Sequence, residues 1–159
     1  DNYDMVKVGN TVPKWTGGIN TTVSWKDLTL SARFDYALGF TAVDWKTMWI
    51  MSCAQGTYNT IEETKNTWTP ENPNAKYPRL GLTSSQTANN TVASTYWMRN
   101  GNFIRFKTLE LGYKFKYGRV YLNGDNIAVF SPFKLWDPEL SWNAYPLQRT
   151  FNIGVQLNF

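Results

Sequence analysis

The chain has 159 residues, enough for one domain with one core, and its 16 Lys and Arg against 12 Asp and Glu leave a mild net charge of +4. The basic residues are scattered among the acidic ones, which argues against nucleic acid as a partner. Without histidine, with Cys53 as the single cysteine and without paired carboxylates at a useful spacing, the sequence predicts no metal site, disulfide, cofactor or enzyme activity within this chain.

The two-residue repeat of the first forty residues predicts a β-hairpin. From Leu28 to Phe40, apolar or aromatic side chains occupy every second position, and mostly polar ones lie between them. The preceding segment 15–26 alternates in the same way. Only a tight turn fits between the two runs, so we expect two long antiparallel strands.

The segment 41–97 lacks this repeat and is predicted to be a long excursion from the sheet. It is rich in aromatic residues, and its prolines favour rigid turns. Aromatic side chains stack on sugar rings or pack against the apolar surface of a partner; alternatively, they hold a long loop together. The candidates for such contacts are Trp45, Trp49, Tyr58, Trp68 and Tyr77.

The second half of the chain predicts three more strands. Together with the first two, the predicted strands cover about 15–26, 28–40, 103–115, 119–130 and 146–159. A short turn at 116–118 and a longer loop at 131–145 connect the last three. The Asp-Pro-Glu sequence at 137–139 in this loop is expected to be a structural turn.

The strand 103–115 contains a conflict in its alternation. Counted back from Leu109, strict alternation turns Arg105 and Lys107 toward the apolar face, where a cation costs about 2–4 kcal/mol at the middle of a bilayer. A β-bulge near Lys107 and Thr108 shifts the register by one residue and removes the conflict. We therefore predict a bulge there.

Four charged side chains fall on the polar faces of the predicted strands. Arg33 and Asp35 share one strand, and Glu110 and Lys114 share another. The two residues of each pair either form an ion pair with each other or contact a plug or a substrate on the polar side of the sheet.

Short turns at one end and long connections at the other predict an all-β, antiparallel, up-and-down sheet. Strands of this length suit a tilted crossing of a membrane, in which about 9–11 residues span the apolar layer. The last strand then turns one side toward lipid, made by Phe151, Ile153, Val155, Leu157 and Phe159. A soluble carbohydrate-binding β-sandwich is the alternative, because its inner faces are equally apolar.

Five stretches of the sequence resemble the C-terminal part of the SusC/RagA-type TonB-dependent outer-membrane transporters of Bacteroidota. They are GNTVPKWTGGINTTVSWKDLTLSARFDYALG (9–39), WTPENPNAKYPRL (68–80), YWMRNGNFIRFKTLELGYKF (96–115), VYLNGDNIAVF (120–130) and WDPELSWNAYPLQRTFNIGVQLNF (136–159). The segment 41–67 matches the family pattern poorly.

The resemblance implies a transmembrane barrel of about 22 strands around a plug, closed by a SusD-like surface lipoprotein and energised by the TonB complex. The plug and the segment that contacts TonB are not in this sequence, and the remaining strands belong to the same or a companion polypeptide. The family imports oligosaccharides or peptides, so we expect part of the wall of such an importer, with the aromatic residues of 41–97 contacting the lipoprotein lid or the substrate. A structural or secretion-associated barrel is a second alternative. The resemblance also implies a periplasmic C-terminus that carries an assembly signal in its last strand, and extracellular long loops.

Overall fold

The computed structural model describes residues 5–52, 60–81, 88–134, 136–140 and 144–158, and the chain divides into two compact units. Unit 1 joins Asp1–Ala42 to Asn100–Phe159, and unit 2 is Val43–Arg99. The long strands of unit 1 are β1 (Trp15–Trp25), β2 (Leu28–Leu38), β5 (Phe103–Phe115), β6 (Gly118–Phe130) and β7 (Thr150–Leu157). A separate two-stranded sheet consists of β3 (Thr41–Val43) and β4 (Met98–Asn100).

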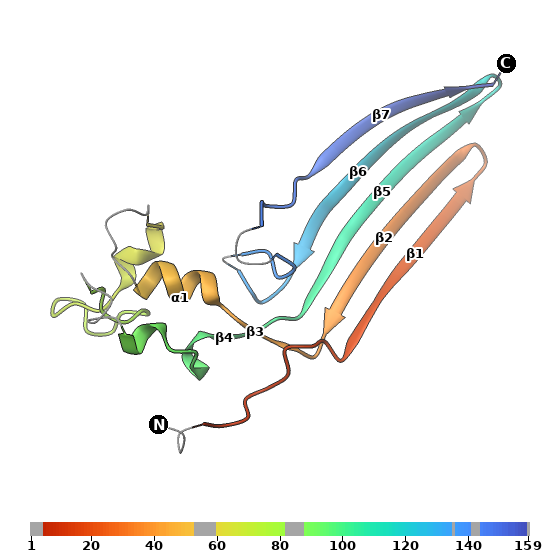
Figure 1. The fold of residues 1–159 in the computed structure, drawn as a ribbon. Coiled ribbons are helices and arrows are strands. Elements are labelled where there is room, and N and C mark those ends of the chain that lie inside the picture. Colours follow the sequence, from red (N-terminus) through yellow and green to blue (C-terminus); the bar gives the residue numbers. More distant parts are fainter. Residues whose placement is uncertain (1–4, 53–59, 82–87, 135, 141–143, 159) are drawn as a thin grey trace. The chain divides into compact units, whose positions relative to one another are not determined.

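The long strands form one open sheet in the order β1-β2-β5-β6-β7, and every neighbouring pair is antiparallel (Figure 1). The sheet follows chain order, as the up-and-down prediction requires. β1 and β7 are its two edges. Among the described residues, no strand pairs with the outer side of either edge.

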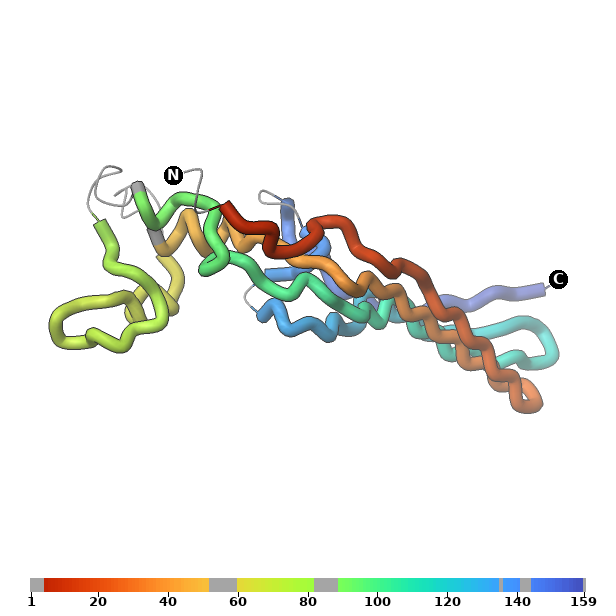
Figure 2. The backbone as a smooth tube through the Cα atoms, turned by 90° about the horizontal axis from the view of Figure 1, so that it is seen from below, coloured from red at the N-terminus to blue at the C-terminus, as the bar shows by residue number. Residues whose placement is uncertain are grey.

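Two tight turns lie at the same end of the sheet. Lys26 and Asp27 connect Trp25 of β1 to Leu28 of β2, and Lys26 takes a positive φ of 53°, which residues other than glycine seldom adopt. The β5–β6 turn is likewise two residues long, one fewer than predicted, because Gly118 already pairs in β6. Figure 2 shows both hairpin ends near the end of β7.

The β-bulge predicted near Lys107 and Thr108 is confirmed. Arg33 of β2 pairs with Thr108, while the next residue, Phe34, pairs with Phe106, so Lys107 is the extra residue. At the same level of the sheet, two residues of β6 lie opposite Lys107. The bulge therefore keeps the apolar side chains of β5 from Ile104 to Phe115 on one face.

β2 ends earlier than the sequence pattern predicts. The pattern continues to Phe40, but Gly39 adopts a φ of +78°, in the left-handed region that favours glycine. The amides of Gly39 and Phe40 then donate to the side-chain oxygen of Asn102. These bonds replace the ladder and end the strand at Leu38.

β7 begins later than predicted, at Thr150 instead of residue 146. Pro146 has no amide hydrogen to give to a ladder. The carbonyls of Leu147 and Gln148 accept hydrogen bonds from the side chain of Asn126 instead of a neighbouring strand. The alternation of side chains in 146–149 was therefore misleading.

Unit 2 has a small core of its own. It contains the helix α1 (Trp45–Ser52) and the 3₁₀ helices η2 (Glu62–Asn66), η3 (Ala88–Thr91) and η4 (Thr95–Trp97). The buried side chains of Met48, Met51, Tyr77 and Trp97 pack together, with Val43 and Ile61 against them. No helix among the described residues is long and apolar enough to cross a membrane.

Candidate functional site

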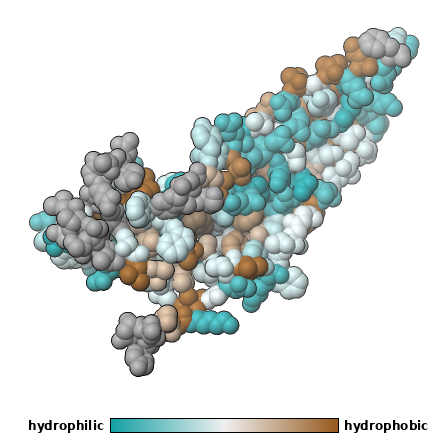
Figure 3. All heavy atoms as spheres, viewed as in Figure 1, coloured by the Kyte–Doolittle hydropathy of each residue, from teal (hydrophilic) through white to brown (hydrophobic). Residues whose placement is uncertain are grey.

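The five-stranded sheet has one apolar and one polar face, since partners in the ladder point to the same side. One apolar row consists of Val23, Leu30, Leu111, Leu122 and Ile153. The adjacent row, on the opposite face, consists of Thr22, Ser31, Glu110, Asn123 and Asn152. The face in view in Figure 3 is largely hydrophilic over the middle of the sheet, and hydrophobic side chains protrude along its β7 edge.

The apolar face is open. Ile153 is 78% exposed, and the neighbouring side chains of β7 that were predicted to share its face, Phe151, Val155 and Leu157, are exposed as well. Phe159, the last of that predicted set, lies outside the described residues. A β-sandwich requires this face to be covered by a second sheet, and no strand among the described residues covers it.

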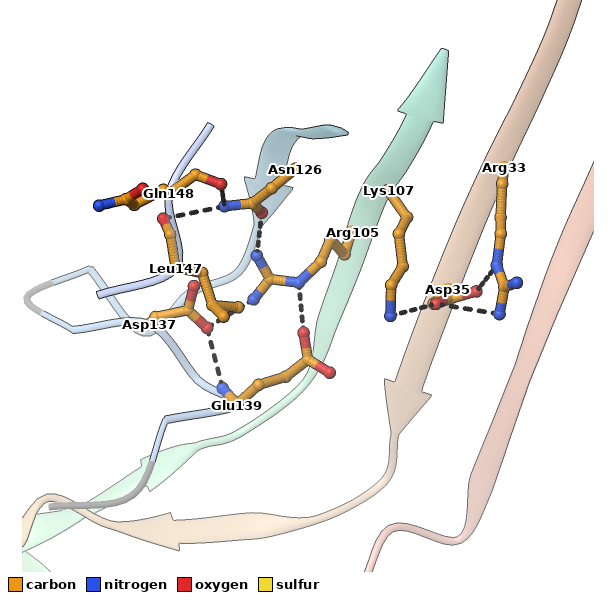
Figure 4. Close-up of polar contacts among 9 residues, drawn as sticks. All are labelled: Arg33, Asp35, Arg105, Lys107, Asn126, Asp137, Glu139, Leu147 and Gln148. Atoms are coloured by element: carbon orange, nitrogen blue, oxygen red, sulfur yellow. Dashed lines mark hydrogen bonds and ion pairs between the residues drawn. The ribbon is translucent and has the colours of Figure 1, made fainter. Parts of the chain in front are cut away.

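The polar face carries a line of ion pairs beside the bulge (Figure 4). Arg33 donates from Nε to Oδ1 of Asp35 at 2.9 Å, as expected for a mutual pair. The bulge adds a third member, because it turns Lys107 to the same face, where its Nζ lies 3.1 Å from Oδ2 of Asp35. The group carries one net positive charge on a partly exposed wall.

A second, enclosed charge centre surrounds Arg105. Its side chain is only 2% exposed, and its guanidinium donates to Asp137, Glu139 and Asn126. Asn126 has a φ of 52°, and its side-chain amide donates hydrogen bonds to the carbonyls of Leu147 and Gln148 (Figure 4). One arginine of the sheet thus holds the middle of the loop that follows β6 directly, through Asp137 and Glu139, and its end before β7 through Asn126.

The acidic turn at 137–139, predicted to be structural, is a turn in the structure. The amide of Leu140 donates to the carbonyl of Asp137 at 3.2 Å, and the amide of Glu139 donates to the Asp137 carboxylate at 3.0 Å. Sequence reasoning did not link this turn to Arg105. More than thirty residues separate Arg105 from Asp137 and from Glu139, so no local pattern in the sequence connects them.

The expected Glu110–Lys114 ion pair is not the one that forms. Glu110 pairs with Arg119 of the neighbouring strand, although the ladder sets Arg119 opposite Lys114 and Asn123 opposite Glu110. The long Arg119 side chain reaches Glu110 across Gly112, which has no side chain to block it. Lys114 is exposed near the hairpin end of β5, and its backbone amide donates to the carbonyl of Asp27.

The aromatic residues predicted for unit 2 fall into two groups. Tyr77 is 2% exposed and belongs to the core, so it holds the unit together, as the second of the two interpretations proposed. Trp45, Trp49 and Trp68 are exposed. Tyr58 lies outside the described residues.

An open pocket of about 450 Å³ lies in unit 2. Trp68 and Tyr96 line it with exposed rings, and the buried Tyr77 and Trp97 contribute further surface. Sequence reasoning did not name Tyr96 and Trp97 as candidates, although both lie within the predicted excursion 41–97. Partial burial raises the pKa of the Tyr96 phenol above its ordinary value, and the hydroxyl donates a hydrogen bond to the carbonyl of Lys76.

Comparison with known proteins gives relatives over nearly the whole chain. No family model matches. TonB-dependent receptor P26 of Formosa agariphila is 29% identical over an alignment that covers 98% of this chain. TonB-dependent receptor SusC of Bacteroides thetaiotaomicron is 31% identical over 55% of it. The chain spans 18% of the length of the first relative and 10% of the second.

Solved structures of a transporter are also similar to this chain. The RagAB peptide transporter matches 95% of this chain with a TM-score of 0.74 at 27% identity, and its open-open state matches with a TM-score of 0.67. In each case this chain covers 18% of the known one. The chain is similar in sequence and fold to the C-terminal part of a SusC/RagA-type TonB-dependent receptor.

A SusC/RagA-type fold accounts for what is unusual in the sheet. The open five-stranded sheet is part of a β-barrel wall, so both edges and the apolar face are incomplete within this chain. TonB-dependent receptors are outer-membrane proteins, and the similarity indicates the outer membrane for this chain too. The relatives are receptors and transporters rather than enzymes.

Proposed function

We propose that this chain forms part of the wall of an outer-membrane importer of oligosaccharides or peptides that is driven by TonB and closed by a SusD-like lipoprotein. The exposed apolar face of a sheet with two unpaired edges carries the proposal. Unpaired backbone groups cost several kcal/mol each in lipid, so further strands must close the barrel, from the same or a companion chain. The similarity to SusC and to the RagAB transporter supports import as the activity.

In the proposed barrel, the apolar face meets lipid and the polar face meets the lumen and its plug. Arg33, Asp35, Glu110 and Lys114 then line the lumen wall, although much of their charge is neutralised by neighbours. The exposed Trp45, Trp49 and Trp68 remain the proposed contacts with the lid or the substrate. The apolar residues of β7 serve as the assembly signal.

The tight-turn end of the sheet is proposed to face the periplasm, and unit 2 the outside of the cell. Single cysteines test this orientation in the full-length protein on a Cys53→Ser background. A membrane-impermeant maleimide should label Thr69→Cys in intact cells and should label Tyr117→Cys only after the outer membrane is permeabilised. The reverse pattern would contradict the proposed orientation.

Import itself is tested by growth and uptake. Cells that carry the gene should take up a labelled oligosaccharide or peptide, and deletion of the gene or of TonB should abolish that uptake. Uptake that persists without TonB, or secretion of a protein through the barrel, would favour the secretion-associated alternative.

A further inference from the structure

We propose that the pocket of unit 2 binds an acidic oligosaccharide, one whose sugar rings carry uronic acid carboxylates. This inference rests on the proposed importer and names its substrate class. The pocket lies between the segment 66–79 and the segment 88–97, and four of its lining residues carry the argument, namely Trp68, Lys76, Arg79 and Tyr96.

The pocket is held in shape by hydrogen bonds between its walls. The Tyr96 hydroxyl donates to the carbonyl of Lys76, and the Trp97 indole donates to the carbonyl of Asn90 at 2.9 Å. The Asn90 side chain donates in turn to the carbonyl of Arg79 at 3.0 Å. A preformed site loses little conformational entropy when a ligand binds.

Two aromatic residues of the pocket are exposed, although two buried aromatic residues also line it. Trp68 is 39% exposed and Tyr96 44%, while Tyr77 and Trp97 are almost fully buried. The core therefore does not require the outer rings to be covered. Their faces offer flat apolar surfaces with a negative quadrupole, which suit the C–H groups on the face of a sugar ring.

The polar part of the pocket is cationic. Lys76 and Arg79 are exposed at its rim, and no carboxylate is among its described lining residues. The Lys76 ammonium lies 5.0 Å from the centroid of the Tyr77 ring, which positions it without neutralising it. A guanidinium presents a fork of donors that matches a carboxylate, so a neutral sugar leaves this part of the pocket unused.

An extended peptide fits this pocket less well than a saccharide. Peptides that bind in an extended form pair with free backbone groups of a strand edge. In the walls of this pocket, the amides of Trp68, Tyr77 and Trp97 already donate to the carbonyls of Tyr77, Asn66 and Ser94. What remains exposed is side-chain surface, namely the aromatic residues Trp68 and Tyr96 and the cationic residues Lys76 and Arg79.

The test is titration calorimetry on the purified full-length protein in detergent. The probes are tetrasaccharides of galacturonate and of mannuronate, each compared with its methyl ester, which keeps the rings and removes the charge. At least one free acid should bind about tenfold more tightly than its ester, because a hydrogen bond to a charged group contributes roughly that much. Added salt should narrow the difference. Failure of both acids to bind, or equal binding of acid and ester, overturns the inference.

Two variants locate the binding in the pocket. Arg79→Gln should weaken binding of the acid about tenfold and leave the ester unchanged, while Trp68→Ala should weaken both. The matched controls are Lys65→Gln and Val92→Ala, which remove an exposed cation and trim an exposed apolar side chain of unit 2 outside the pocket. Acid binding that is unaffected by the pocket variants, or equally affected by the controls, overturns the inference.

Uptake by cells separates this inference from the proposed function. If TonB-dependent uptake of an oligosaccharide or peptide is unchanged by Arg79→Gln and Trp68→Ala, the importer stands and the pocket is not its substrate site. The pure protein could instead bind oligouronates through the pocket while cells show no TonB-dependent uptake of any of these compounds. The binding site would then be supported and the importer function contradicted.

Discussion

The guanidinium of Arg105 is almost fully enclosed and donates to three side chains, two of them carboxylates of the loop that follows β6. Removal of one partner from a buried ionic cluster leaves the other charges unpaired, which costs about 3–5 kcal/mol. We therefore expect Arg105→Ala to release residues 136–140 from the sheet and make them sensitive to added protease in the folded protein.

The neighbouring ion pair is the control for this prediction. Arg33 is half exposed, and pairs of that kind contribute about 0–1 kcal/mol. Arg33→Ala should therefore leave the protease pattern unchanged. Equal protection of the loop in the Arg105 and Arg33 variants would show that Arg105 does not hold it.

Gly118 occupies a position where the backbone of the next strand leaves no room for a side chain. A Cβ there would overlap the backbone carbonyl of Gln156 in β7, and a backbone atom cannot move aside. We expect Gly118→Ala to cost about 1–3 kcal/mol and to lower the yield of assembled barrel, measured as the heat-modifiable band on gels. Gly112→Ala is the control, because its Cβ would meet the flexible side-chain end of Arg119. Equal yields from the two variants would contradict this explanation.

At the scale of the strand, the bulge explains which residues tolerate a charge. Leu109 pairs with Ala32 and Gly124 in the apolar face, whereas its neighbour Thr108 lies on the polar face. A cation near mid-depth on the lipid side costs about 2–4 kcal/mol. Leu109→Arg should therefore reduce the amount of folded protein in the outer membrane, and Thr108→Arg should not. Normal levels of the Leu109 variant would contradict the assignment of that face to lipid.

The strands were predictable because their alternation is a local property of the sequence. The bulge was predictable for the same reason, since Arg105 and Lys107 conflicted with the pattern of their own strand. The start of β7 was predicted too early, which shows the limit of this reasoning. The Asn126 side chain that donates to the carbonyls of Leu147 and Gln148 lies more than twenty residues away in the sequence.

The candidate site was less predictable than the strands. Composition indicated aromatic contacts in 41–97, but burial decides which rings are available, and burial depends on the packing of segments distant in sequence. Tyr77, which was predicted as a contact residue, therefore belongs to the core, while Tyr96, which was not predicted, lines the pocket. The partners of Arg105 and Glu110 were missed for the same reason.

At the scale of the whole molecule, the proposals assign the barrel wall to unit 1 and recognition to unit 2. The amide of Gly101 donates to the carbonyl of Phe40 at 3.1 Å, and the amide of Thr41 donates to the carbonyl of Asn10 at 2.8 Å. The chain thus leaves and re-enters unit 1 at one place, where a short Gly-Ser linker can replace Val43–Arg99. In the full-length protein, this deletion should leave the heat-modifiable band unchanged and abolish binding of oligouronates. Loss of the folded band would show that unit 2 is needed to build the wall, and the two units would then form one cooperative structure.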